Sequence, residues 1–202
     1  MKTCFFVDGF NLYHAINASE SLHKYKWLNL RRLAELFLKS DDTLEKVYYF
    51  SALATWDQNK MQRHQTYIEA LKSVGVEVIL GEFRRKSVKC QATCRRFFNT
   101  YSEKETDVNI AVKVFQAAVK EEYEKAFIIS GDSDLIPAIR GVQEVFPVKE
   151  FGVIVPIGRH AELLKEVANF HMKLKEKHLE AAQFPNQIMA GHKILERAAS
   201  WI

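Results

Sequence analysis

Short apolar runs alternate with longer segments of helical spacing along this chain. The apolar runs predict strands at residues 2–7, 46–53, 76–83, 126–129, 148–155 and 170–174. Between them, apolar positions recur every three or four residues, which predicts helices over 27–39, 58–74, 135–142 and 160–168, and a further helix opening near Thr106. The alternation predicts an α/β fold, a three-layer α/β/α sandwich around a central, mainly parallel sheet.

The strand predicted at 126–129 is apolar throughout, which is typical of a strand buried on both faces. It is followed at once by Ser130, Gly131, Asp132, Ser133 and Asp134. In open α/β sheets, ligands bind at the carboxyl ends of the strands, so the two acids are candidate site residues. The same residues could equally form only a capped turn into the next helix, because Gly, Asp and Ser all favour turns.

Two other segments place acids in similar positions. The strand at 2–7 ends in Asp8, with Asn11 three residues on, and the helix predicted near Thr106 carries Asp107 in its first turn. Right-handed crossovers place parallel strand ends on one edge, so we expect these residues to share a rim with Asp132. The alternatives are a simple Asx turn at Asp8 and, with Thr106 as the cap, an ordinary acid that complements the helix dipole.

Composition places the chain among soluble globular proteins. It has 202 residues, 48% of them hydrophobic and 27% charged, which is enough for one sizeable core. No apolar run approaches the ~20 residues of a membrane span, and the first apolar segment is too short for a signal peptide. We therefore expect a cytoplasmic protein without a membrane partner.

Positive charge is concentrated in one segment, although the net charge is only +4. Six basic residues fall between positions 84 and 96 without an acid, and aromatic residues flank them: Arg84, Arg85, Lys86, Lys89, Arg95 and Arg96, with Phe83, Phe97, Phe98 and Tyr101. Such a mixture suits phosphate contact and base stacking on single-stranded nucleic acid. A solvated loop with buried aromatic anchors is the alternative.

The three cysteines, an odd number, argue against a disulfide framework. Cys90 and Cys94 could provide half of a zinc site, but a structural zinc needs about four ligands and no histidine lies nearby in the sequence. Cys4 falls inside the first strand and is expected in the core. We therefore expect no zinc at Cys90 and Cys94.

The candidate acids, Asp8, Asp107, Asp132 and Asp134, are hard oxygen ligands without a matching set of His or Cys. Such a set favours Mg²⁺ or Mn²⁺, which keep coordination positions open for water and substrate phosphate. An acidic pocket beside a basic, aromatic segment predicts metal-dependent hydrolysis of phosphodiester bonds.

Three segments together resemble the NYN domain in its LabA-like branch, a relative of the PIN-domain ribonucleases. They are Phe6-Val7-Asp8-Gly9-Phe10-Asn11, Lys104-Glu105-Thr106-Asp107-Val108-Asn109 and Ser130-Gly131-Asp132-Ser133-Asp134, and the match spans about residues 3–173. The resemblance implies a PIN-like fold and a ribonuclease site formed by the four aspartates, with Asn11 and Ser130 as supporting polar groups. The basic segment and Pro156-x-Gly158-Arg159 also resemble this branch, which adds Arg159 to the candidate RNA-binding residues.

We therefore expect a NYN nuclease domain at residues 1–174 and a C-terminal extension at 175–202, either a helix or an extended arm. The expected partner is RNA, and a homodimer is left open. A catalytically silent RNA-binding or regulatory adaptor is the main alternative. A phosphatase of the haloacid dehalogenase type is disfavoured, because Phe10 stands where that family has its second acid.

Overall fold

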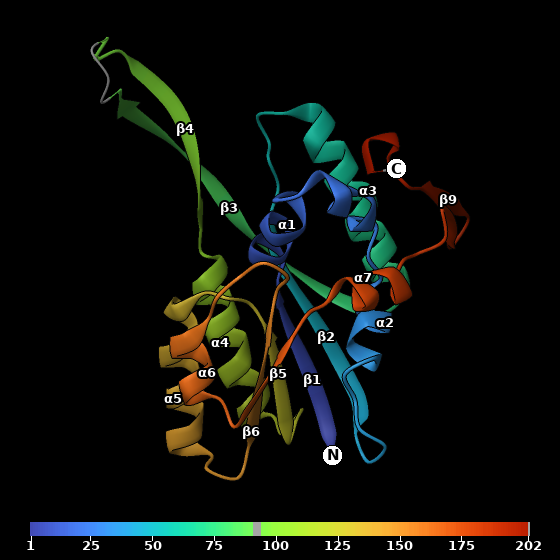
Figure 1. The fold of residues 1–202 in the computed structure, drawn as a ribbon, viewed down its shortest axis with the longest axis vertical. Helices are drawn as coiled ribbons and strands as arrows, with labels where there is room; N and C mark the ends of the chain where they lie inside the picture. The colour runs from blue at the N-terminus through green and yellow to red at the C-terminus, as the bar shows by residue number, and fades with distance from the viewer. Residues whose placement is uncertain (91–93, 202) are drawn as a thin grey trace.

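A seven-stranded sheet runs through the computed structural model, which describes residues 1–90 and 94–201 (Figure 1). Its strands are β1 (Lys2–Asp8), β2 (Thr43–Ala52), β3 (Val76–Lys89), β4 (Phe97–Lys104), β5 (Lys125–Ile129), β6 (Glu150–Val155) and β7 (Phe170–Lys173). The order is β4-β3-β2-β1-β5-β6-β7, and every neighbouring pair is parallel except β3 with β4. The carboxyl ends of the central strands β1 and β5 therefore lie side by side.

Helices cover both faces of the sheet (Figure 1). They are α1 (Gly9–Asn17), α2 (Leu30–Glu35), α3 (Gln58–Ser73), α4 (Thr106–Val119), α5 (Ile136–Val145), α6 (Glu162–Val167) and α7 (Glu176–Ala181), with short 3₁₀ turns at Glu20–Tyr25, Ser133–Leu135 and Ala199–Trp201. Side chains alternate along β1: Phe5 and Val7 pack under α1, α2 and α3, whereas Cys4 and Phe6 pack under α4, α5 and α6. Two cores on opposite faces of one sheet confirm the predicted α/β/α sandwich.

The basic segment differs from the prediction. The third strand does not end at Phe83 but continues to Lys89, and the chain returns as β4 to form an antiparallel hairpin that projects from the body (Figure 1). Backbone pairing from Glu82 opposite Lys104 to Lys89 opposite Phe97 holds these polar residues extended. Hydrophobic periodicity did not predict this hairpin, because few of its side chains are buried.

Two helices near the N-terminus also differ. The stripe at 27–39 predicted one long helix, but α2 begins only after Asn29, whose side chain caps it, and ends at Glu35. Beyond that, the amides of Leu36 and Phe37 close tight three-residue turns. The segment after Asp8, for which a simple Asx turn was the alternative, is the helix α1, and the side chain of Asp8 caps it.

The C-terminal segment is a short helix followed by a two-stranded hairpin, β8 (Gln187–Ala190) and β9 (Lys193–Glu196), which Gly191 turns with φ +62°. Trp201 packs back against the domain, with its ring centroid 6.2 Å from Trp27 and 6.0 Å from Tyr67. The segment thus lies against the α3 side of the sheet. Nowhere in the described part of the chain is there a helix with the length and apolar character needed to cross a bilayer.

Candidate metal centre and adjoining aromatic cavity

Three carboxylates meet where β5 ends and α4 begins. Asp107, Asp132 and Asp134 each offer an oxygen within 4.8 Å of the others, and no second such group of His, Cys, Asp or Glu occurs among the residues that the structure describes. Asp132 is half-buried and the other two are exposed. A compact, solvent-accessible set of carboxylate oxygens fits a hard divalent cation, which binds oxygen ligands.

Asp132 has both of the roles that the sequence left open, a cap of the following turn and a member of the acidic cluster. One carboxylate oxygen accepts the backbone N–H of Asp134 at 3.0 Å and so caps the 3₁₀ turn that leads into α5. Its own N–H donates to the hydroxyl of Ser130 at 3.0 Å. The capped turn and the acidic cluster are therefore the same structure, since the cap fixes the orientation of the carboxylate.

Asp8 lies buried behind this cluster. Its two oxygens accept the backbone N–H of Asn11 at 2.9 Å and the hydroxyl of Ser130 at 2.7 Å. The amide oxygen of Asn11 in turn accepts the N–H of Gly131 at 3.1 Å, which ties the end of β1 to the end of β5. Burial raises the pKa of Asp8 above its ordinary value. The hydrogen bonds from Asn11 and Ser130 lower the pKa in part, and the negative charge of Asp132 raises it further.

Asp107 reaches the cluster through an unusual turn. Glu105, with φ +74°, precedes the first helical residue, Thr106, so the predicted cap at Thr106 is wrong by one residue. The hydroxyl of Thr106 instead donates to the carboxylate of Glu103. Burial, followed by the charges of Asp132, Asp8 and Asp134, raises the pKa of Asp107.

Glu103 is a further acid at this site that sequence reasoning did not select. Burial is the largest cause that raises the pKa of Glu103 to about 7. The hydrogen bond from Thr106 opposes this rise, and the negative charges of Asp8 and Asp107 add to it. It lies near the end of β4, just before α4. The sequence signal for Glu103 was its place in the same acidic segment as Asp107. That signal was insufficient, because Glu103 reaches the rim only through strand β4, which the hydrophobic pattern did not predict.

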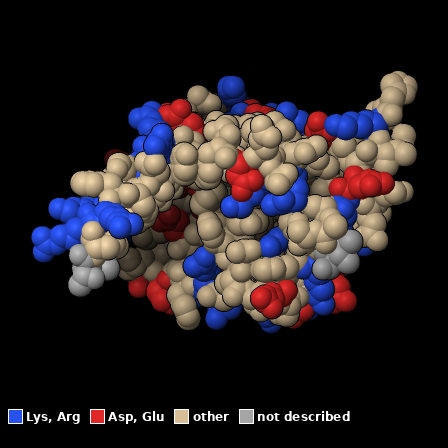
Figure 2. Space-filling model, turned by 90° about the horizontal axis from the view of Figure 1, so that it is seen from above, with Lys and Arg blue, Asp and Glu red and all other residues tan. Residues whose placement is uncertain are grey.

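The hairpin presents two different faces. Residues 83, 85 and 89 of β3 share one face with 97, 101 and 103 of β4, because the register pairs Phe83 with Glu103, Arg85 with Tyr101 and Lys89 with Phe97. Arg84 and Lys86 lie on the opposite face, where Arg84 pairs with Glu82 and, at 3.2 Å, with Glu105. Figure 2 shows basic side chains gathered on the projecting hairpin and acidic ones deep in the hollow beside it.

The other predicted RNA-contact residues are also exposed. Arg95 and Arg96 lie near the hairpin tip, and Arg159 follows the end of β6, with its Cβ next to Gly131. Cys94 is exposed and no zinc-type ligand set including it occurs in the described residues. The residues between the two cysteines, 91–93, lie outside the described part of the chain.

A cavity of about 580 Å³ opens beside the N-terminus of α1, where Gly9 and Phe10, the two residues after Asp8, are part of its lining. Gly9 lies against the ring of Tyr49, where a Cβ would come within 2.4 Å of the tyrosine Cε2. Aromatic residues make up much of the lining: Phe10, Tyr13, His14, Tyr49, Trp56, His64, Tyr67, Phe83, Tyr101 and Trp201. No sequence pattern indicated this cavity, because its walls come from segments scattered along the chain.

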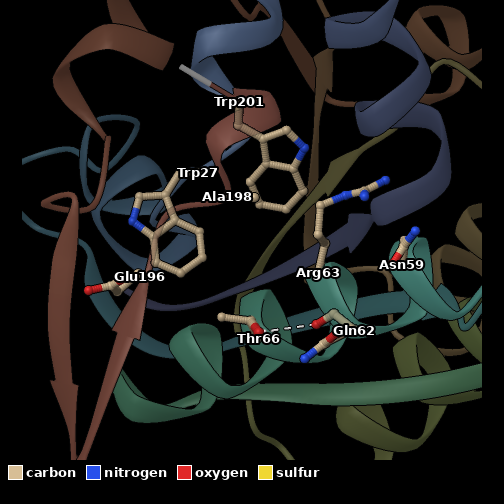
Figure 3. A pocket seen from close by; sticks show the side chains of 8 residues that line it. All are labelled: Trp27, Asn59, Gln62, Arg63, Thr66, Glu196, Ala198 and Trp201. Atoms are coloured by element: carbon tan, nitrogen blue, oxygen red, sulfur yellow. Dashed lines mark hydrogen bonds between the residues drawn. The ribbon is translucent and has the colours of Figure 1, made fainter.

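A smaller cavity of about 240 Å³ adjoins the C-terminal segment, and Arg63 and Trp201 line both. Figure 3 shows the side chain of Arg63 extending from α3 beside the indole of Trp201, with Trp27 nearby. The C-terminal segment therefore contributes a wall to the aromatic cavity.

Comparison with known proteins finds similarity to a curated protein and to a solved structure. The curated protein is 6-hydroxy-3-succinoylpyridine 3-monooxygenase HspA of Pseudomonas putida. The two sequences are 24% identical over an alignment of 240 residues, gaps included, which covers 100% of this chain and 75% of the relative. The structure is that of a protein of unknown function from Vibrio parahaemolyticus, with a TM-score of 0.59, 16% identity, and coverage of 86% of this chain and 93% of the other. The latter likeness concerns the fold.

The NYN domain model matches residues 2–174, which spans the whole central sheet and every carboxylate of the acidic cluster. With this match over most of its length, the chain belongs to the NYN domain family.

Proposed function

We propose that this protein is a Mg²⁺- or Mn²⁺-dependent endoribonuclease that cleaves single-stranded RNA in the cytoplasm. The observation that carries the proposal is the convergence of Asp107, Asp132 and Asp134 within 4.8 Å, beside a basic hairpin. We further assign the chain to the LabA-like branch of the NYN family, on the motifs around Asp8, Asp107 and Asp132.

In this proposal the three clustered carboxylates hold the cation, and Asp8 keeps the two strand ends in place through Ser130 and Asn11. A divalent cation held by these carboxylates would activate water and neutralise charge on the scissile phosphate. Glu103, whose pKa of about 7 lets it exchange a proton near neutral pH, is a candidate general acid or base.

The hairpin supports the choice of a polyanionic substrate. Arg85, Lys89 and Phe97 lie on the face that continues to Tyr101 at the cavity. A single strand laid along this face would meet positive charges for its phosphates and aromatic rings for its bases. Arg159, on the far side of Gly131, offers a further positive charge at the rim.

A second candidate is oxygenation of a small heteroaromatic acid. It is favoured by the aromatic cavity beside Asp8 together with the name of the Pseudomonas putida relative. That reaction would consume dioxygen, two protons and two electrons from an external reductant such as a reduced nicotinamide, with one oxygen atom bonded to the substrate and the other leaving as water.

The test is incubation of the protein with end-labelled single-stranded RNA, matched DNA and duplex RNA, in Mn²⁺, Mg²⁺ or chelator. We expect cleavage of the single-stranded RNA that requires metal and disappears in Asp132→Asn. RNA binding without cleavage in every condition would instead support the silent adaptor. Oxygen consumption with 6-hydroxy-3-succinoylpyridine and reduced nicotinamide, absent in controls lacking either, would support the oxygenase.

A further inference from the structure

The aromatic cavity beside Asp8 is built from parts that the acidic cluster does not use. Trp56 stacks on Tyr101 with ring centroids 3.7 Å apart and an angle of 4° between the planes, and it meets Phe83 edge-on at 4.8 Å. Trp56 itself is 40% exposed and Tyr13 is 43% exposed, so both rings lie at the mouth. Because the Trp56 side chain stays partly exposed despite both contacts, part of its indole is accessible to another flat ring.

Charge at the cavity has one sign. Lys26, Lys60 and Arg63 are in the lining, and among the described residues no Asp or Glu joins them there. Lys60 pairs with Asp57 at 3.3 Å, but in the described part of the chain Arg63 has no carboxylate partner within 4.0 Å. Lys26 and Arg63 are both half-buried in this lining, and burial, followed by the charge of Arg63, lowers the pKa of Lys26. A negatively charged group is the natural complement to this arrangement.

Polar groups at the floor can orient a ring. The hydroxyl of Tyr49 lies 3.2 Å from Nε2 of His64. Burial lowers the pKa of His64 to about 4, so the imidazole is neutral at neutral pH and adds hydrogen-bonding atoms without further charge. Flat apolar walls with a few polar groups, in a volume of about 580 Å³, are typical of a small-ligand site.

We propose that this cavity binds a planar aromatic ring carrying a negatively charged group, the chemistry of a nucleotide unit or of a free aromatic carboxylate. The ring stacks on Trp56, and the anionic group meets Arg63 and Lys26. This goes beyond the proposed function, since the binding rests on aromatic and cationic residues and does not need the carboxylate cluster or its metal.

The test is isothermal titration calorimetry of the full chain in chelator, with uridine monophosphate, adenosine monophosphate, uridine and nicotinate as probes. We expect the charged probes to bind and uridine to bind more weakly. Tighter binding of the nucleotides than of nicotinate identifies a nucleic-acid unit as the ligand, and the reverse order identifies a free aromatic acid. Because metal is absent, the result is independent of whether the protein cleaves RNA.

Two variants and one control make the test specific. Trp56→Ala should weaken binding by at least about fivefold, the lower end of what loss of one stacked base costs. Arg63→Gln should reduce the preference for uridine monophosphate over uridine, because only Lys26 then remains to meet the phosphate. Phe115→Ala removes an aromatic residue of similar exposure, 39%, on α4 outside the cavity and should leave binding unchanged. Absence of binding by every probe, or wild-type binding in both Trp56→Ala and Arg63→Gln, would overturn the proposal.

Discussion

The hydroxyl of Ser130 donates to the buried carboxylate of Asp8 at 2.7 Å and accepts the N–H of Asp132 at 3.0 Å. One side chain thus joins the end of β1 to the loop that carries two of the clustered acids. This arrangement gives Asp8 and Asp132 different tasks, because Asp8 is fixed by two donors inside the protein while Asp132 faces the rim.

Ser130→Ala should therefore act through Asp8. Removing the hydroxyl leaves a buried carboxylate oxygen without its donor, which costs about 1–3 kcal/mol in the free energy of unfolding. RNA cleavage should fall because the acidic loop loses its anchor. Urea unfolding and initial cleavage rates would measure both effects, with Ser133→Ala, an exposed serine of the same loop, as the control. Equal stability of the two variants would contradict this role.

The carboxylate cluster should reduce stability in the absence of metal. Asp132→Asn relieves repulsion among three acids and keeps an oxygen for the cap, so we expect its melting temperature in chelator to rise by about 2–4 °C per kcal/mol of relieved repulsion. Mn²⁺ should raise the melting temperature of the wild type and not that of Asp132→Asn. Asp41→Asn, an exposed acid elsewhere, should behave as wild type. A variant that keeps the full response to Mn²⁺ would show that the ion binds elsewhere.

The two faces of the basic hairpin should differ in their effect on RNA binding. We expect the pair Arg85→Gln and Lys89→Gln to weaken binding of single-stranded RNA and to lower the slope of log affinity against log salt by roughly 0.7 per lost phosphate contact. Arg84→Gln with Lys86→Gln removes the same charge from the opposite face and should have the smaller effect. Filter binding over a range of salt concentrations would measure these RNA affinities, with every variant also carrying Asp132→Asn so that the RNA is not cleaved. Equal loss from both faces would indicate only a general attraction by charge.

A buried ion pair far from the rim should control acid stability. Lys125 and Asp42 are 2.6 Å apart, with side chains 4% and 1% exposed. Burial alone would raise the pKa of Asp42, but the bonds from Lys125 and from the backbone of Lys39 outweigh it, so the pKa lies below its ordinary value. The stabilisation is then complete above about pH 4, the unfolded-state pKa, and is lost as pH falls through the lower pKa of the folded state.

Asp42→Asn should thus lower the free energy of unfolding by about 3–5 kcal/mol at neutral pH, because Lys125 is left buried without its partner. The difference from wild type should shrink on acidification. Urea unfolding at several pH values measures this, with Glu77→Gln, which breaks the more exposed pair with Lys113, expected to cost less than about 1 kcal/mol. A difference independent of pH would mean that the charge of Asp42 is not what stabilises the fold.

The layered fold and the position of the acids could be predicted because both arise from local patterns. Strand β5 is wholly apolar, and in a parallel sheet the residues after β5 lie at the same edge as the residues after β1, so topology alone brought Asp8 and Asp132 together. The division of tasks among the acids could not be predicted. It depends on hydrogen bonds such as the one from Ser130 to Asp8, between residues 122 positions apart.

The hairpin and the cavity could not be predicted, for two different physical reasons. The hairpin is held by backbone pairing between residues such as Lys86 and Thr100, which leave no trace in hydrophobic periodicity. The cavity is lined by Trp56, His64 and Trp201, among others, which are far apart in the sequence. In the sequence, an aromatic residue that lines a cavity looks the same as one that packs in the core. Only the folded arrangement distinguishes a ring that fills a core from one that lines an opening.

A cation held by Asp107, Asp132 and Asp134 should be required for RNA cleavage, and a titration with Mn²⁺ can test this requirement. Bound ion, measured by electron paramagnetic resonance, and the initial rate of RNA cleavage would be followed in the same samples. We expect the rate to rise in step with occupancy in the wild type, and Asp132→Asn to lose both together. Cleavage that persists in chelator, or Mn²⁺ binding undiminished in Asp132→Asn, would contradict the proposed role of the cluster.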